Sequence, residues 1–80
     1  MEFIYYDYRA GNKVRDELKE ILGDYLIENK DDEGTYHTLA IPEEKLGGVI
    51  IALSTNYDVM FSGGSRYLFI DNKGFKFRQR

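Results

Sequence analysis

Cysteine is absent from this 80-residue sequence, and proline and histidine occur once each. Without cysteine, the chain has no disulfide framework and no thiolate site. It opens with Glu2 and aromatic residues rather than with the basic and then apolar segments of a signal peptide. The longest uninterrupted apolar run, Val49 to Leu53, is far shorter than the roughly 20 residues that span a bilayer. These absences predict a cytoplasmic protein without a membrane span.

The motifs of common catalytic and metal sites are absent as well. The sequence has no G-x-S-x-G elbow, no G-x-x-x-x-G-K-[ST] or G-x-G-x-x-G phosphate loop, no calcium loop and no zincin histidine pair. We therefore predict a non-enzymatic protein that needs no cofactor and no metal. One alternative is a small ribonuclease-like enzyme, in which His37, the single histidine, would act with a nearby carboxylate or arginine.

Charge is distributed unevenly along the chain, whose net charge is −3. Residues 1–60 carry six Lys/Arg and thirteen Asp/Glu, a net of −7, whereas residues 61–80 carry five and one, a net of +4. The acidic residues concentrate, with Lys30 as the only local cation, at Asp24, Glu28, Asp31, Asp32 and Glu33. Such a segment repels nucleic acid and attracts a basic protein surface, although a solvated loop rim would have the same composition.

Eighty residues provide for one hydrophobic core, so the sequence predicts a single domain over residues 1–80. Residues 2–8 are dense in aromatic and β-branched side chains, which favour a strand. Strand alternation places Phe3 and Tyr5 on one side and Ile4, Tyr6 and Tyr8 on the other. A strand with two apolar faces is expected to be central in its sheet or covered on both sides.

From Asn12 onward, the pattern changes to the spacing of a helix. The apolar residues with this spacing are Val14, Leu18, Ile21, Leu22 and Tyr25. Asn12 is suited to cap the free amides at the start, and Gly23 is suited to end the helix in the left-handed conformation. A helix that continues to Asn29 is the alternative.

A second helix is predicted from Pro42, because proline tolerates the first helical position and the following Glu43 and Glu44 favour the positive end of the helix dipole. One face of this helix would carry Leu46, Val49, Ile50 and Leu53. The glycines at 47 and 48 disfavour a helix by about 1 kcal/mol each relative to alanine. A strand over residues 49–54 is therefore the alternative.

The remaining segments are predicted to form antiparallel strands joined by polar, glycine-containing turns. A hairpin joins residues 24–30 to residues 35–41, and a meander follows with strands at 57–61, 66–70 and 75–79 and turns at 62–65 and 71–74. The resulting order, βαββαβ with an extra C-terminal β-hairpin, resembles a ferredoxin-like split βαβ unit. The predicted class is α+β, with two helices packed on a mainly antiparallel sheet, and this element order implies no function.

The last predicted hairpin is the most informative feature for function. If its turn lies at 71–74, the core face carries Leu68, Ile70, Phe75 and Phe77. The opposite face then carries Tyr67, Phe69, Lys76, Arg78 and Arg80. Tyrosine and arginine are typical anchors of protein interfaces, and aromatic platforms flanked by Lys and Arg also bind nucleic acid. In a third interpretation, a helix covers the two aromatic residues and the cations form a solvated edge.

We therefore expect a protein-binding module that uses this face, with Asp31, Asp32 and Glu33 as auxiliary contacts. In size and charge the chain is similar to the small acidic inhibitors that viruses and mobile elements use against host enzymes, such as anti-CRISPR or anti-restriction proteins. This resemblance implies a host enzyme as the partner. A nucleic-acid-binding domain that uses the C-terminal aromatic and basic face is the alternative. A monomer and a homodimer are both compatible with a sheet that has two apolar faces.

Overall fold

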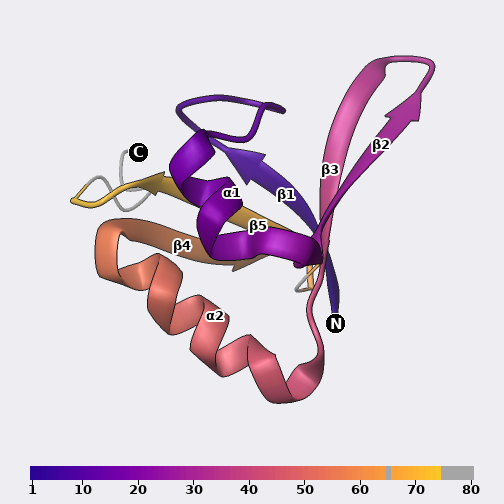
Figure 1. The fold of residues 1–80 in the computed structure, drawn as a ribbon. Helices are drawn as coiled ribbons and strands as arrows, with labels where there is room; N and C mark the ends of the chain where they lie inside the picture. Colours follow the sequence, from indigo (N-terminus) through magenta and orange to yellow (C-terminus); the bar gives the residue numbers. More distant parts are fainter. Residues whose placement is uncertain (65, 75–80) are drawn as a thin grey trace.

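The computed structural model describes residues 1–64 and 66–74, in which five strands and two α-helices form an α+β fold (Figure 1). In chain order the elements are β1 (Glu2–Asp7), α1 (Asp16–Leu22), the 3₁₀-helix η1 (Gly23–Tyr25), β2 (Leu26–Asp31), β3 (Gly34–Ala40), α2 (Glu43–Asn56), β4 (Tyr57–Ser62) and β5 (Tyr67–Asn72). The predicted class, two helices packed with a mainly antiparallel sheet, is confirmed. No helix in these residues is long and apolar enough to cross a membrane.

The five strands lie in the order β2-β3-β1-β5-β4, so β1 is in the centre of the sheet, as predicted. It pairs antiparallel with β3 and parallel with β5, while the β2–β3 and β4–β5 pairs are antiparallel. The ferredoxin-like order is not confirmed, because β5 lies between β1 and β4. In that position β5 has a neighbour on each side, and its Leu68 and Ile70 are completely buried.

Helix α1 begins at Asp16 rather than directly after Asn12, because residues 8–15 form a loop tied back to β1. In this loop the N–H of Gly11 donates to the carbonyl oxygen of Asp7 at 2.6 Å. The helix ends at Leu22, which confirms the predicted stop, but Gly23 combines a φ of 52° with a ψ of −130°, so it is not in the left-handed helical conformation and instead begins η1. The alternative helix to Asn29 is wrong, because residues 26–31 form a strand that pairs with β3.

The predicted hairpin between residues 24 and 41 is confirmed as β2–β3. Asp31 pairs with Gly34, so the connecting loop contains only Asp32 and Glu33. The Asp31 Oδ1 atom accepts the backbone N–H of Glu33 at 2.8 Å, which holds the loop in its turn. This hairpin projects well beyond the rest of the sheet (Figure 1), and its acidic loop is exposed.

Helix α2 begins at Glu43, directly after Pro42, and continues through both glycines to Asn56. The alternative strand over residues 49–54 is therefore wrong. Leu53 is fully buried, and three further apolar residues pack against the core: Leu46, Val49 and Ile50. Tertiary burial of this face outweighs the low helix propensity of the glycines.

Strands β4 and β5 form the predicted hairpin across the glycine turn that follows Ser62. The prediction of a turn that starts at Asp71 is wrong, because Asp71 and Asn72 still pair with Asp58 and Tyr57 of β4. The last predicted strand, residues 75–79, lies outside the described residues. Phe75 and Phe77, which were expected on the core face, lie outside them too.

One side of the sheet, which we call the helix face, contains the core, and both helices pack on it (Figure 1). The buried members from the strands and their ends are Phe3, Tyr5, Leu39, Ile41, Tyr57, Leu68 and Ile70. Those from α1, α2 and the loop before α1 are Val14, Leu18, Leu22 and Leu53. The core of the described residues is therefore one-sided, and neither α1 nor α2 covers the opposite side of the sheet.

A buried ion pair fixes the loop that follows β1. The Asp7 side chain is completely buried and accepts hydrogen bonds from Arg15 Nε at 2.7 Å and Nη2 at 3.1 Å. Arg15 also donates to Oδ1 of Asn72 at 3.1 Å, and its Cζ atom lies 5.3 Å from the centre of the Tyr57 ring. Partial burial lowers the pKa of Arg15, but the hydrogen bond and the charge of Asp7 more than offset this, so the pKa is raised. The loop of residues 8–15 is thereby held against β5.

Candidate functional site

The side of the sheet opposite the helices, which we call the open face, presents a continuous aromatic surface. Strand alternation and pairing place on it Ile4, Tyr6, Ile27, Tyr36, Met60, Tyr67 and Phe69. Tyr8 and Phe69 stack with their ring centroids 5.5 Å apart, and Tyr67 and Phe69 stack at 5.9 Å. Tyr6 meets Phe69 edge-on at 5.7 Å. Tyr8 is 46% exposed and Tyr67 is 37% exposed, so these rings are accessible to a partner.

The sequence-predicted residues of β5 divide between the two faces as expected. Leu68 and Ile70 are buried on the helix face, and Tyr67 and Phe69 lie on the open face. The interpretation in which a helix covers Tyr67 and Phe69 is wrong, because both helices pack on the other side. The three cations expected beside these rings, Lys76, Arg78 and Arg80, lie outside the described residues.

The acidic loop of the β2–β3 hairpin and the aromatic surface meet in one hollow, which we call the hairpin pocket. Its volume is about 440 Å³, and its lining residues are Ile4, Asn12, Asp31, Glu33, Gly34, Thr35, Tyr36 and Tyr67. Of the predicted binding residues, it brings together Tyr67, Asp31 and Glu33, which come from β5, β2 and the hairpin loop. Asp32 lies in the same exposed loop but does not line the pocket.

The open face carries acidic charge. Among the described strand residues that point to this face, the acidic ones are Glu2, Asp31, Asp71 and the buried Asp58, and no lysine or arginine is present. Asp58 accepts the backbone N–H of Gly74 through Oδ2 at 2.9 Å, and Asp71 accepts that of Asn72 at 2.7 Å. The surface therefore attracts cationic groups and repels phosphates.

Two residues that complete this surface were not assigned a binding role from the sequence. On the open side, Tyr8 stacks on Phe69, and Tyr36 lines the hairpin pocket together with Tyr67. Strand alternation along residues 2–8 places Tyr8 on the side opposite the core residues Phe3 and Tyr5, so the local sequence could have identified Tyr8. No local signal places Tyr36 near Tyr67, because the two tyrosines are brought together only by the pairing of β3 and β5 with β1.

His37 lies on the helix face, opposite Tyr5 in the β1–β3 ladder. Its Nδ1 atom is 2.9 Å from the carbonyl oxygen of Asn12, and since a carbonyl only accepts, Nδ1 carries the proton and donates. The imidazole also packs edge-on against Tyr5, with ring centroids 6.4 Å apart. In this arrangement His37 anchors the loop of residues 8–15 to β3. In the part of the chain that the structure describes, no cluster of three or more potential metal ligands occurs.

A second polar group on the helix face is the phenol of Tyr5. Its hydroxyl is buried and has no hydrogen-bond partner among the described residues. Burial, and after it the negative charge of Asp7, raise the pKa of this phenol above its ordinary value of about 10. The pKa of Tyr57 is raised as well, by burial and by the charge of Glu17. These groups belong to the packed interior around the Asp7–Arg15 pair and present no chemistry to a ligand.

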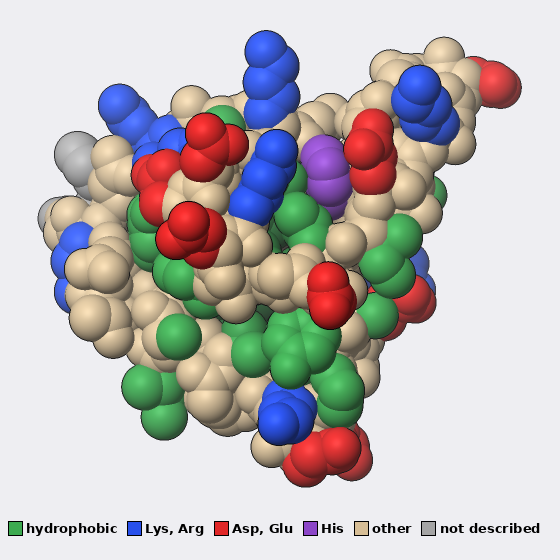
Figure 2. Space-filling view, in the orientation of Figure 1, with side chains coloured by type: hydrophobic (Ala, Val, Ile, Leu, Met, Phe, Trp, Pro, Cys, Tyr) green, Lys and Arg blue, Asp and Glu red, His purple; other side chains and the backbone are tan. Residues whose placement is uncertain are grey.

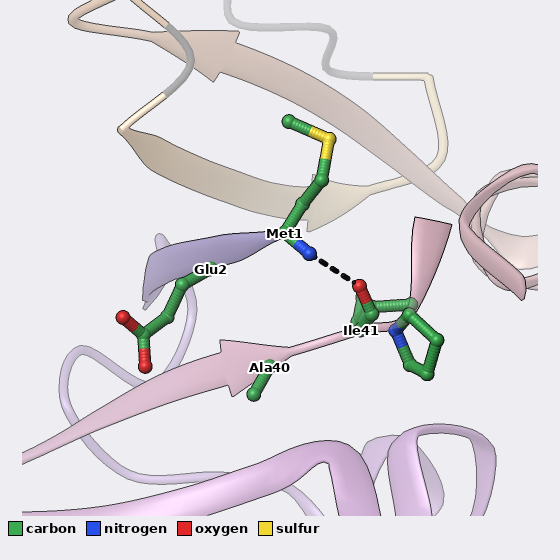
Figure 3. Close-up of a pocket in the computed structure, with 5 residues that line it drawn as sticks. Met1, Glu2, Ala40 and Ile41 are labelled. Atoms are coloured by element: carbon green, nitrogen blue, oxygen red, sulfur yellow. Dashed lines mark hydrogen bonds between the residues drawn. The ribbon is translucent and has the colours of Figure 1, made fainter. Parts of the chain in front are cut away.

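Two further hollows lie away from the predicted binding residues. One, of about 460 Å³, lies at the start of β1, where the Met1 amine donates to the carbonyl oxygen of Ile41 at 2.6 Å (Figure 3). The other, of about 360 Å³, lies between α1 and α2, where Ile21, Tyr25 and Val49 contribute to its lining. Figure 2 shows hydrophobic side chains between the helices, with acidic and basic side chains interleaved over α1. Neither hollow combines aromatic walls with a concentration of one charge.

No protein-family model matches the chain, and comparison with curated proteins and with solved structures gave no match. We therefore infer the function from the geometry and charge of the open face.

Proposed function

We propose that the protein is a non-enzymatic binding module whose open face receives a protein partner. The observation that carries the proposal is the convergence of Tyr67, Asp31 and Glu33 on the hairpin pocket, at the edge of an exposed aromatic surface. Rigid tyrosine rings provide large contact area at low entropic cost, which favours recognition of a protein surface. The acidic hairpin loop adds a second point of contact beyond the sheet.

The charge of the described open face favours protein over nucleic acid. A phosphate backbone would meet Glu2, Asp31 and Asp71, and the described strand residues that point to this face include no lysine or arginine. The nucleic-acid alternative depends on Lys76, Arg78 and Arg80, which lie outside the described residues. A viral or mobile-element inhibitor of a host enzyme, located in the cytoplasm, remains the specific form of the hypothesis that size, charge and the absence of cysteine support.

Affinity capture with matched variants tests the proposal. Tagged wild-type protein, Tyr67→Ala and Ile51→Ala are each exposed to a lysate of a relevant host. Ile51 is a suitable control because it is apolar, 71% exposed and located on α2, away from the open face. We expect a protein that co-purifies with the wild type and with Ile51→Ala but is lost from Tyr67→Ala. Equal capture by all three variants, or no captured protein, would count against the proposal.

Size exclusion with light scattering, without and with single-stranded RNA and DNA at low salt, separates the alternatives. We expect no change in elution with either nucleic acid. A shift that disappears with added salt would instead support phosphate binding, since each phosphate contact releases counterions. The mass of the protein alone gives the oligomeric state, and a dimer would place a second copy on the open face or at a sheet edge.

A further inference from the structure

The hairpin pocket combines acidic residues with aromatic residues, which suits the binding of a cationic, planar side chain. We propose that it binds the guanidinium group of an arginine on the protein partner, an inference that rests on the function proposed above. The partner surface would accordingly be basic, with at least one arginine that projects between the β2–β3 hairpin and the centre of the open face.

Two carboxylates supply the charge. Asp31 ends β2 on the open face, Glu33 follows in the two-residue loop, and both residues line the pocket from the hairpin. The Asp31 Oδ1 atom accepts the backbone N–H of Glu33 at 2.8 Å, which orients this carboxylate. Its Oδ2 atom has no partner among the described residues, so it can accept a hydrogen bond from a guanidinium.

Two tyrosines supply flat walls. Tyr67 of β5 pairs with Ile4 of the central strand, and Tyr36 of β3 lines the same pocket two residues along from Thr38, the β3 partner of Ile4. A planar guanidinium stacks on an aromatic face while its edge donates to carboxylates, whereas a lysine ammonium is a compact point charge that cannot use both features in the same way. The volume of about 440 Å³ leaves room for the guanidinium and part of its stem.

The surrounding charge narrows the class of occupant. The described strand residues whose side chains point to the open face include no lysine or arginine, and strand alternation places the side chain of Lys30, next to Asp31 on β2, on the other side of the sheet. A second copy that presented the described strand residues of the same face would bring no lysine or arginine to Asp31 and Glu33. An arginine on a basic segment of another protein could stack on the tyrosine rings and pair with the carboxylates.

Titration of ¹⁵N-labelled protein with three short peptides at low salt tests this inference. The probes are the acetylated amides of tri-arginine, tri-lysine and tri-citrulline, where citrulline retains the shape of arginine without its charge. We expect tri-arginine to shift the amide resonances of Tyr36, Tyr67 and the hairpin loop. We expect tri-lysine to bind about threefold to tenfold more weakly, and tri-citrulline to cause no saturable shift.

A matched pair of double variants separates the pocket from general charge attraction. Asp31→Asn with Glu33→Gln should weaken tri-arginine binding about fivefold or more, because it neutralises the pocket while asparagine can still form the turn. Glu43→Gln with Glu44→Gln removes the same charge from the exposed start of α2 and should leave affinity nearly unchanged. Three results would each overturn the proposed arginine site: an equal loss of tri-arginine affinity in both double variants, equal affinities for tri-arginine and tri-lysine, or amide shifts located away from the hairpin pocket.

The failure of this inference is distinguishable from failure of the proposed function. If a captured partner is lost with Tyr67→Ala but retained with the Asp31→Asn and Glu33→Gln double variant, the open face binds a protein, but the hairpin pocket does not bind an arginine of that protein. Loss of the partner with both changes, together with the peptide specificity, is the expected result.

Discussion

Substitution of Asp7 by asparagine is expected to destabilise the protein severely, although the change alters hardly any volume. The Asp7 carboxylate is completely buried and accepts two hydrogen bonds from Arg15 and one from the backbone N–H of Arg9 at 2.8 Å. Asparagine replaces one acceptor oxygen with a donor amide, which would face a donor of the guanidinium. It also leaves the positive charge of Arg15 without its buried counter-charge.

The expected loss follows from these contacts. Hydrogen bonds to charged groups contribute about 1.5–3 kcal/mol each, so the two from Arg15 give about 3–6 kcal/mol. Breaking one partner of a buried ion pair usually costs about 3–5 kcal/mol. The Arg15 side chain is 24% exposed and retains its bond to Asn72, so water and this amide compensate in part. We therefore expect Asp7→Asn to lower the free energy of unfolding by about 3 kcal/mol.

Urea denaturation at neutral pH, followed by far-ultraviolet circular dichroism, measures this loss. Asp24→Asn is the matched control, since the same chemical change at an exposed position of η1 should cost less than about 0.5 kcal/mol. Arg15→Ala and the double variant complete a thermodynamic cycle, in which a strong coupling between Asp7 and Arg15 is expected. A loss below about 1 kcal/mol in Asp7→Asn would refute the claim that this pair holds the loop of residues 8–15.

Two further predictions concern the rings around the sheet. Gly63 and Gly64 have φ values of 63° and 67°, so alanine strains the backbone at either position, but only at 63 would its Cβ lie 2.9 Å from the Tyr67 ring. Gly63→Ala should therefore weaken partner or tri-arginine binding more than Gly64→Ala does, while both destabilise by about 1 kcal/mol in urea; equal binding by the two variants would show that the position of Tyr67 is unimportant. At alkaline pH, the raised pKa of Tyr5 means that the folded protein retains a proton that the unfolded chain loses near pH 10, so stability is full below that pH and falls above it. Tyr5→Phe removes an unpartnered hydroxyl, so it should not destabilise the protein at pH 7 and should flatten the loss between about pH 9 and 11 measured by urea denaturation; an unchanged slope would contradict this assignment.

Local patterns in the sequence predicted most of the elements, whereas contacts between distant residues decided what was missed. Gly23 and Pro42 mark helix boundaries through backbone geometry, and both predictions are confirmed. The late start of α1 depends on Arg15 reaching back to Asp7, and no propensity of residues 12–15 signals that ion pair. The strand character of residues 71–72 likewise comes from their partners on β4 rather than from their own turn-forming composition.

The candidate site shows the same division. Alternation along β5 correctly separated Tyr67 and Phe69 from the buried Leu68 and Ile70. That Tyr67 would share a pocket with the acidic hairpin could not be read from the sequence, because it depends on the strand order β3-β1-β5. A ferredoxin-like order without β5 beside β1 would have separated these residues. Sheet order is set by the total burial that a topology achieves, and no single segment encodes it.

The one-sided core has a consequence for how stability and binding are related in this domain. All fully buried apolar side chains in the described residues lie on the helix face or in the elements that cover it, while the stacked rings of Tyr8, Tyr67 and Phe69 occupy the other side. Truncation of an exposed ring such as Tyr67 removes contact area for a partner but opens no cavity in the core. The central strand β1 contributes Tyr5 to the core and Tyr6 to the open face, so the same backbone that the core holds rigid also fixes the rings that a partner would meet. Truncation of an exposed ring on the open face should therefore weaken partner binding without lowering the free energy of unfolding much. The aromatic surface of the open face should already be formed before the partner binds.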